Sequence, residues 1–237
     1  MRVASPDCAA LHPGYGFYGS GCANCTVAQQ MPLAGALLLA AFRGMLSTPP
    51  PRTAATMSIF DLELRTDRLL LRPPRLEDLP DFVAFGGDDE VMRHLGGVQA
   101  PSQCWRSLAG LVGAWHMHGF AMFSVFERTS GHWVGRVGPW QPLDWPGTEV
   151  GWSLRRSSWG LGYAQEAAAA SIDWAFDALG WDEVIHTIAA DNASSKRVAQ
   201  RLGSGFLRLD RLPPPADGMG VEVWGQRRAQ WNAMRGR

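Results

Sequence analysis

The sequence predicts a mixed α/β domain over residues 58–237, and three observations support this fold class. Short apolar runs typical of strands alternate with segments whose apolar residues recur every three or four positions, as in amphipathic helices. The strand-like run Glu149–Leu154 is followed by Gly160, Gly162 and an alanine-rich helical pattern. A β-branched run at 182–190 is followed by a second helical pattern with capping residues at both ends.

The first half of this region contains the elements that lead to the two glycines. The expected strands are 68–72, 120–127, 132–137 and 148–154, and the expected helices are 76–85, 90–95 and 101–117. Glu77 and Asp78 suit the first turn of a helix, where the helix dipole favours carboxylates. The turn Arg128–Gly131 contains a glycine that suits a hairpin, so the strands on either side of it are expected to pair.

The second half continues the alternation of helices and strands. The expected elements are a helix at 167–178, a strand at 182–190, a helix from about 191 to 203, and strands at 206–209 and 221–227. Asn192 suits a helix N-cap, and Gly203 suits a helix end. We expect the strand 221–227, which carries Trp224, to lie at an unpaired sheet edge that could support a homodimer; a monomer is the alternative.

Gly160 and Gly162 lie where a strand passes into a helix, an arrangement that suits a phosphate group. The first amide N–H groups of a helix have no partner within it, and the helix dipole places partial positive charge there. Glycine lets the backbone approach a ligand closely. Taken alone, however, a Gly-x-Gly pair is weak evidence, because many such pairs are only turns.

Two segments together resemble a known family. Trp159-Gly160-Leu161-Gly162-Tyr163-Ala164 resembles motif A of the GNAT N-acetyltransferases, Arg/Gln-x-x-Gly-x-Gly/Ala, in the form used by the RimJ/RimL-type branch. Trp159 replaces the family's Arg or Gln, a departure that is tolerable because the family uses this stretch chiefly through backbone amides. Downstream, 191–203 resembles motif B, Asn-x-x-Ser followed by a helix ending in Leu-Gly. Taken alone, motif B is simply a capped helix.

The resemblance implies a GNAT-like fold, in which a central, mostly antiparallel sheet is splayed in the middle and has helices on both faces. It also implies acetyl-CoA as co-substrate, with the pyrophosphate on the motif A amides and the pantetheine arm paired with the preceding strand like an extra strand. The implied cofactor-binding residues are Trp152, Ser153, Leu154, Trp159, Gly160, Leu161, Gly162, Tyr163, Ala164, Asn192, Ser195 and Arg197. Arg155, Arg156 and Lys196 are further candidates for the CoA phosphates. Ordinary solvated charge is the alternative, and it explains Arg155 and Arg156 equally well.

Acetyl transfer to an amine needs a group that accepts the proton of the amine. Glu149, at the start of the motif A strand, is the candidate base, and a surface carboxylate at a strand edge is the alternative. The resemblance implies that Ser195 protonates or hydrogen-bonds the CoA sulfur; a local bond at the helix start is the alternative. His186 lies among apolar residues and is interpreted as a core histidine rather than a base.

We therefore expect an acyltransferase that moves an acetyl group from acetyl-CoA directly to a primary amine, either a protein N-terminus or a small molecule. The loop 138–147 is expected near the acceptor. The tryptophans that either line the acceptor pocket or belong to the core are Trp115, Trp133, Trp140 and Trp145. Two other functions remain open, namely a non-catalytic CoA-binding module and an interaction module on the same fold.

Composition excludes several partners. The chain has 22 Lys and Arg against 22 Asp and Glu, so nucleic acid is not an expected partner. Residues 1–57 are expected to be a disordered or non-native extension. Their apolar run Met31–Phe42 is shorter than the roughly 20 residues needed to span a bilayer, so no membrane is expected as a partner. Cys22-x-x-Cys25 lacks the second pair of a zinc site, so no metal is expected. Cysteine usage, including a packed thiol at Cys104, favours a cytoplasmic location.

Overall fold

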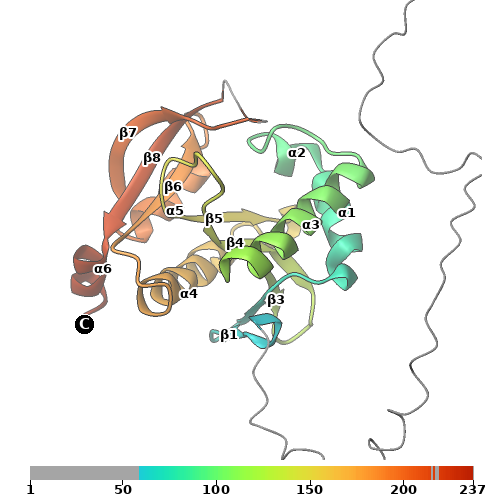
Figure 1. The fold of residues 1–237 in the computed structure, drawn as a ribbon, viewed down its shortest axis with the longest axis horizontal. Helices are drawn as coiled ribbons and strands as arrows, with labels where there is room; N and C mark the ends of the chain where they lie inside the picture. The colour runs from blue at the N-terminus through green and yellow to red at the C-terminus, as the bar shows by residue number, and fades with distance from the viewer. Residues whose placement is uncertain (1–58, 215, 217–218, 237) are drawn as a thin grey trace, which may run out of the picture. The chain divides into compact units, whose positions relative to one another are not determined.

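The structure is a computed structural model that describes residues 59–214, 216 and 219–236 (Figure 1). The strands are β1 (Leu64–Arg65), β2 (Leu69–Arg72), β3 (Phe123–Glu127), β4 (Trp133–Trp140), β5 (Glu149–Leu154), β6 (Glu183–Ala189), β7 (Gly205–Arg211) and β8 (Gly220–Arg227). The α-helices are α1 (Leu79–Gly86), α2 (Asp89–Met92), α3 (Pro101–His118), α4 (Tyr163–Asp177), α5 (Ala193–Arg201) and α6 (Arg228–Arg235). The expected extension at 1–57 lies outside the described residues.

The eight strands form one sheet in the order β1-β2-β3-β4-β5-β6-β8-β7. Every neighbouring pair is antiparallel except β5 and β6, which run parallel. These two strands are in register at one pair only, Glu149 with Ile185, and then diverge. The predicted mixed, mostly antiparallel and splayed sheet is therefore confirmed, and Figure 1 shows β6, β7 and β8 turning away from β4 and β5.

Helices cover both faces of the sheet. Neighbouring residues of a strand point to opposite faces, so Phe123 and Ser124 of β3 mark the two sides. On the Ser124 side, the ring nitrogen of Trp133 donates to the Ser124 hydroxyl, and Phe85 of α1 packs edge-on against Trp133 with ring centroids 5.6 Å apart. On the other side, Phe123 packs against Trp174 of α4 at 5.3 Å.

Three local expectations need correction. The strand expected to end at residue 137 continues to Trp140. Pro139 lies where β4 pairs with β5 but no longer with β3, so the N–H that proline lacks is not needed for a hydrogen bond to β3. The strand 221–227 is not an edge, because β8 pairs with β6 on one side and β7 on the other, and β7 is the edge. A helix not expected from the pattern, α6, buries Trp231 against the core.

Candidate active site

A cavity of about 730 Å³ lies where β5 and β6 separate. Side chains alternate between the two faces of a strand, so Glu149 and Trp152 of β5 point to opposite faces. Both residues line the cavity, which therefore passes through the gap between the two strands. His94 also lines it, and His94 Nδ1 lies 3.3 Å from a carboxylate oxygen of Asp191, which joins the loop after α2 to the turn after β6.

Glu149 is the buried acid of this cavity, with only 5% of its surface exposed. Its Oε2 accepts hydrogen bonds from Trp145 Nε1 at 2.5 Å and from Thr187 Oγ1 at 2.9 Å. Burial raises the pKa of the Glu149 carboxyl to about 7, and the two hydrogen bonds oppose that rise. The interpretation of Glu149 as a surface carboxylate is therefore wrong, because this is a buried group that titrates near neutral pH.

We expect Glu149→Gln to stabilise the protein at alkaline pH. Because the folded-state pKa of about 7 lies above the ordinary 4.5, the folded protein holds this proton more tightly than the unfolded chain, and stability falls as pH rises between these values. Glutamine removes the buried charge and keeps an oxygen that can accept from Trp145. At about pH 9 the free energy of unfolding should rise by up to about 3 kcal/mol, measured by denaturant titration. The difference should vanish at about pH 4, and an equal difference at both pH values would contradict the role of buried charge.

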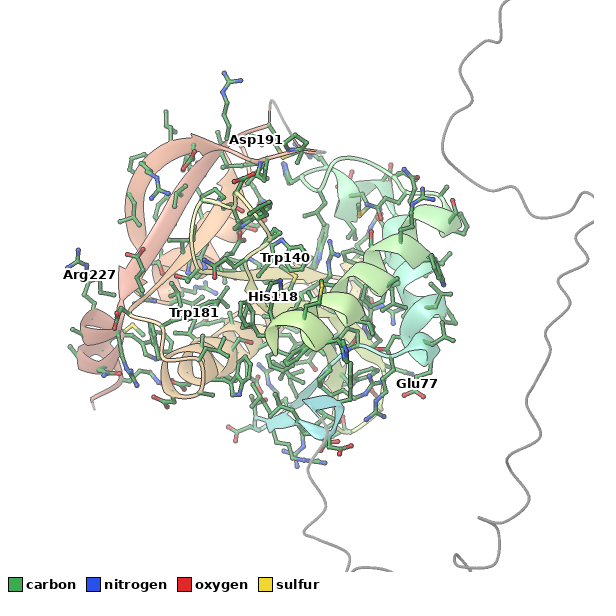
Figure 2. The ribbon with its side chains drawn as sticks, in the orientation of Figure 1. Glu77, His118, Trp140, Trp181, Asp191 and Arg227 are labelled. Carbon is green, nitrogen blue, oxygen red and sulfur yellow. The ribbon has the colours of Figure 1, made fainter. Side chains whose placement is uncertain are left out.

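The four tryptophans considered for the acceptor side divide between the cavity and the core. Trp140 and Trp145 line the cavity, with ring centroids 6.5 Å apart, and Figure 2 labels Trp140 in the region between the sheet and α3. Trp115 and Trp133 are buried in the hydrophobic core instead. The hydrogen bond from Trp145 to Glu149 explains this division, because it holds the loop after β4 over the start of β5.

His186 is a core histidine, as expected, although its ring borders the cavity. Its Nδ1 lies 2.7 Å from the backbone oxygen of Val150, and its Nε2 lies 2.9 Å from the Ser204 hydroxyl. The carbonyl can only accept, so Nδ1 carries the hydrogen and Nε2 accepts from the hydroxyl. Burial lowers the pKa of His186 to about 4. The ring is therefore neutral and its basic nitrogen is occupied at neutral pH.

The glycine turn has an open backbone that other residues hold in place. Gly160 and Gly162 have left-handed φ angles of 75° and 81°, and Gly162 is the N-cap of α4. A Cβ added at Gly160 would meet no atom within 4 Å, so there is space above the turn. Arg68 braces the turn, because its Nη1 donates to the Leu161 carbonyl at 2.9 Å and its Nε to Glu166 at 2.6 Å. Glu166, placed in the first turns of α4, is thus an ion-pair partner as well as a dipole-favoured residue.

The side chains of this segment mostly serve to fix its shape. Trp159 Nε1 donates to the backbone oxygen of Leu154 at 2.9 Å, and the Tyr163 hydroxyl bonds to the carboxylate of Glu127. Ala164 packs against the core. The amides at the start of α4 are therefore the groups of this segment that are placed to meet a phosphate.

The edge of β5 that faces β6 has no strand partner beyond Glu149, and α5 lies beside it. Trp152 Nε1 donates to Ser195 Oγ at 3.3 Å, while the Ser195 backbone N–H donates to Asn192 Oδ1 at 3.0 Å. Asn192 Oδ1 also accepts from the Ser194 hydroxyl at 2.8 Å. Asn192 thus caps α5 with its oxygen, which leaves its amide nitrogen for a ligand.

The cations considered for the CoA phosphates differ in their partners. Arg156 pairs with Asp88 at 2.5 Å, and Lys196 pairs with Glu222 at 2.9 Å. Arg197 is exposed on α5 and forms no ion pair with the described residues. Of these three side chains, Arg197 is therefore the one whose charge is not already matched by a carboxylate of the protein.

Arg136 of β4 lines the cavity and was not predicted from the sequence. The loop 94–99 and the segment that carries Met219 border the same cavity and were not predicted either. A charged residue within an otherwise apolar strand was the available signal for Arg136. The two loops carry no local signal, because tertiary folding alone brings them to this cavity.

The geometry is that of a known family. A model of the family described as acetyltransferase (GNAT) domain matches residues 68–204, which is more than half of the chain and includes the glycine turn and α5. The chain therefore belongs to the GNAT acetyltransferase family, whose members use acetyl-CoA. The family supports an acyltransferase, and the mixed sheet of eight strands matches the fold of its solved members.

Individual relatives agree with this assignment. The chain is similar to the acetyltransferase from Agrobacterium tumefaciens strain C58, with 30% identity and a TM-score of 0.62, covering 75% of this chain and 100% of that one. It is 29% identical over 154 residues to the uncharacterized protein YkkB of Bacillus subtilis, covering 63% of this chain and 88% of the relative. It is 28% identical over 153 residues to the uncharacterized N-acetyltransferase p20 of Bacillus licheniformis, covering 61% and 85%.

Several other expectations concern groups outside the cavity. Within the described ranges, no helix is long and apolar enough to cross a membrane, and no cluster of three or more His, Cys, Asp or Glu residues is placed to hold a metal ion. Cys104 is buried, as expected of a packed thiol, and burial raises the pKa of its thiol. The pair Cys22 and Cys25 lies outside the described residues.

Proposed function

We propose that this protein transfers the acetyl group of acetyl-CoA directly to a primary amine, as an N-acetyltransferase of the RimJ/RimL type. The observation that carries the proposal is Glu149, a buried carboxyl with a pKa near neutral, placed beside an unpaired strand edge that leads to an open glycine turn. The primary amine is either a protein N-terminus or a small molecule.

The chain's own groups fit acetyl-CoA along this edge. The pyrophosphate would accept hydrogen bonds from the amides at the start of α4, where the helix dipole favours an anion. The pantetheine amides would pair with the free edge of β5 at Trp152, Ser153 and Leu154, and the Asn192 amide nitrogen would donate from the opposite side. This arrangement would place the thioester close to the start of β5.

The reaction then needs three events at the thioester. The amine nitrogen attacks the thioester carbonyl, and Glu149 takes the proton that the amine loses, directly or through a water molecule. A backbone N–H of β5 stabilises the oxyanion of the tetrahedral intermediate. When the C–S bond breaks, the thiolate of CoA accepts a proton, for which the Ser195 hydroxyl is the candidate donor because its oxygen accepts from Trp152 and its hydrogen remains free to donate. The serine oxygen then regains a proton from water, and Glu149 releases to water the proton that it took from the amine.

Two measurements on the full chain test this function. Calorimetric titration with acetyl-CoA should show binding, and CoA release should rise when N-terminal peptides or small primary amines are added. Binding without CoA release for any amine would support the non-catalytic module instead. No binding of acetyl-CoA at all would support the interaction module and would contradict the proposed function.

A further inference from the structure

Arg136 has a half-buried side chain whose positive charge no described residue neutralises. Its Nε atom is buried without a hydrogen-bond partner, and its guanidinium forms no ion pair with any carboxylate in the described ranges. The contact that the structure does give it is with the face of Phe85, 5.6 Å from the ring centroid. Burial lowers the pKa of the Arg136 guanidinium from its usual range. A charge kept in this state is unfavourable unless a ligand pairs with it.

The guanidinium lies on the sheet face that α1 covers, because it contacts Phe85 of that helix. Arg136 pairs with Ser124 of β3 and with Ser153 of β5, so these side chains share one face of the sheet. Trp140 pairs with Glu149 on that same face, four residues further along β4. At the rise of an antiparallel strand, Arg136 and Glu149 are therefore about 13 Å apart along the sheet.

Two neutral amide side chains line the same cavity as Arg136. Gln99 and Gln103 line the cavity with it. The Gln103 side-chain oxygen accepts from the backbone N–H of Ala100 at 2.8 Å, which leaves its amide nitrogen as a donor. The cavity thus offers the positive charge of Arg136 and an amide donor, with the Glu149 carboxylate further along the same sheet face.

We propose that Arg136 binds a carboxylate group of the acceptor, so that the acceptor is an amino acid or short peptide whose amine lies at Glu149 and whose carboxylate lies at Arg136. This inference rests on the proposed function and names the substrate class of the same site. The planar guanidinium fork matches a carboxylate through two parallel hydrogen bonds. A single unmatched cation suits a monoanion better than a phosphate dianion, and it repels polyamines.

The CoA phosphates are the competing partner for Arg136. The glycine turn leads into α4, and α4 packs on the Phe123 face of the sheet, opposite the face that carries Arg136. The phosphates are therefore expected to bind on the other side of the splay. This separation predicts that Arg136 contributes to acceptor recognition and not to acetyl-CoA affinity.

The test compares matched acceptors that differ only in charge. The probes are ω-amino acids from glycine to aminohexanoate and glycyl peptides of increasing length, each offered as the free acid and as the carboxamide, with spermidine as a polycation. The full chain should acetylate the best acid with kcat/KM at least about 30-fold above its amide, the effect of a charge-assisted hydrogen-bonded pair. In Arg136→Met this ratio should fall to about one. Equal ratios in the two proteins, or a preference for spermidine, would overturn the proposal.

Arg106→Met is the matched control, because it removes the same charge from an exposed position of α3 that does not line the cavity. It should keep the acid-to-amide ratio of the unmodified protein. Acetyl-CoA affinity should be the same in both variants, and a tenfold loss confined to Arg136→Met would assign the guanidinium to the CoA phosphates instead. Thermal melting tests whether Arg136 has a structural role instead, since removing a charge without an ion-pair partner should leave the melting temperature unchanged or raise it.

Direct binding keeps this proposal separate from the proposed function. The N-acetylated forms of the same acids and amides are titrated into the CoA-bound protein by calorimetry, which requires no turnover. Tighter binding of the acids, lost in Arg136→Met, supports the carboxylate site even if no amine is acetylated. Equal binding of acids and amides contradicts it, whether or not the protein is active.

Discussion

Glu149→Gln is expected to lower the rate of acetyl transfer about 10²-fold at neutral pH, which corresponds to about 2.7 kcal/mol in the activation barrier. Glutamine has nearly the same shape as glutamate and keeps an oxygen near Trp145, but it cannot accept the proton of the amine. The affinity for acetyl-CoA should stay within about twofold, because Glu149 lies on the sheet face that carries Arg136, away from the glycine turn. Stopped assays of CoA release and calorimetry measure the two quantities.

The pH profile decides between a base and a residue that merely shapes the cavity. Since the pKa of Glu149 is raised to about 7, the active carboxylate form is lost below that pH, and kcat should fall along an acidic limb. Glu149→Gln should abolish this limb. If the amine instead arrives neutral and positioning alone drives the reaction, the variant loses only a few-fold in rate and the limb persists.

Thr187→Val provides a second variant that leaves the carboxyl in place. The Thr187 hydroxyl donates to Glu149 at 2.9 Å and holds the pKa of the carboxyl lower than burial alone would set it. Without this donor, the acidic limb should move to higher pH while the rate on the alkaline plateau stays close to that of the unmodified protein. An unmoved limb would show that another group titrates.

Local patterns predicted the elements well where the sequence signal is itself local. The Gly160 and Gly162 turn, the Asn192 cap and the Gly203 helix end all depend on a few neighbouring residues, and the structure contains each of them. The edge position assigned to 221–227 was wrong because the order of strands depends on contacts far apart in the chain. β8 lies between β6 and β7, and no pattern within β8 records that.

The candidate site shows the same limit. Glu149 was singled out from its place at the start of a strand, but its burial comes from Trp145 and Thr187, which fold over it from two other segments. Arg136 was missed because its neighbours are distant in sequence and because a charged residue in a strand usually faces solvent. The pairing of β4 with both β3 and β5 places it inside the cavity.

Gly162→Val is expected to weaken acetyl-CoA binding at least tenfold, or about 1.4 kcal/mol. The residue caps α4 with φ at 81°, a conformation that β-branched residues rarely adopt, so valine would reshape the turn whose amides are proposed to bind the pyrophosphate. The added Cβ would also lie 3.4 Å from Nη2 of Arg68, the residue whose Nη1 braces the turn. Calorimetry with acetyl-CoA measures the loss.

Gly180→Val separates the effect on the ligand from the cost of backbone strain. Gly180 has φ at 70°, and a Cβ there meets no atom within 4 Å. Valine at Gly180 should therefore impose backbone strain of about 1–2 kcal/mol, similar to that at Gly162. Gly180 lies beyond the opposite end of α4, about 22 Å from Gly162. Both variants should lose similar amounts of thermal stability, but only Gly162→Val should lose acetyl-CoA affinity. If the two folded variants bind acetyl-CoA with equal affinity, the pyrophosphate does not bind at the Gly162 turn, because both variants carry the same backbone strain.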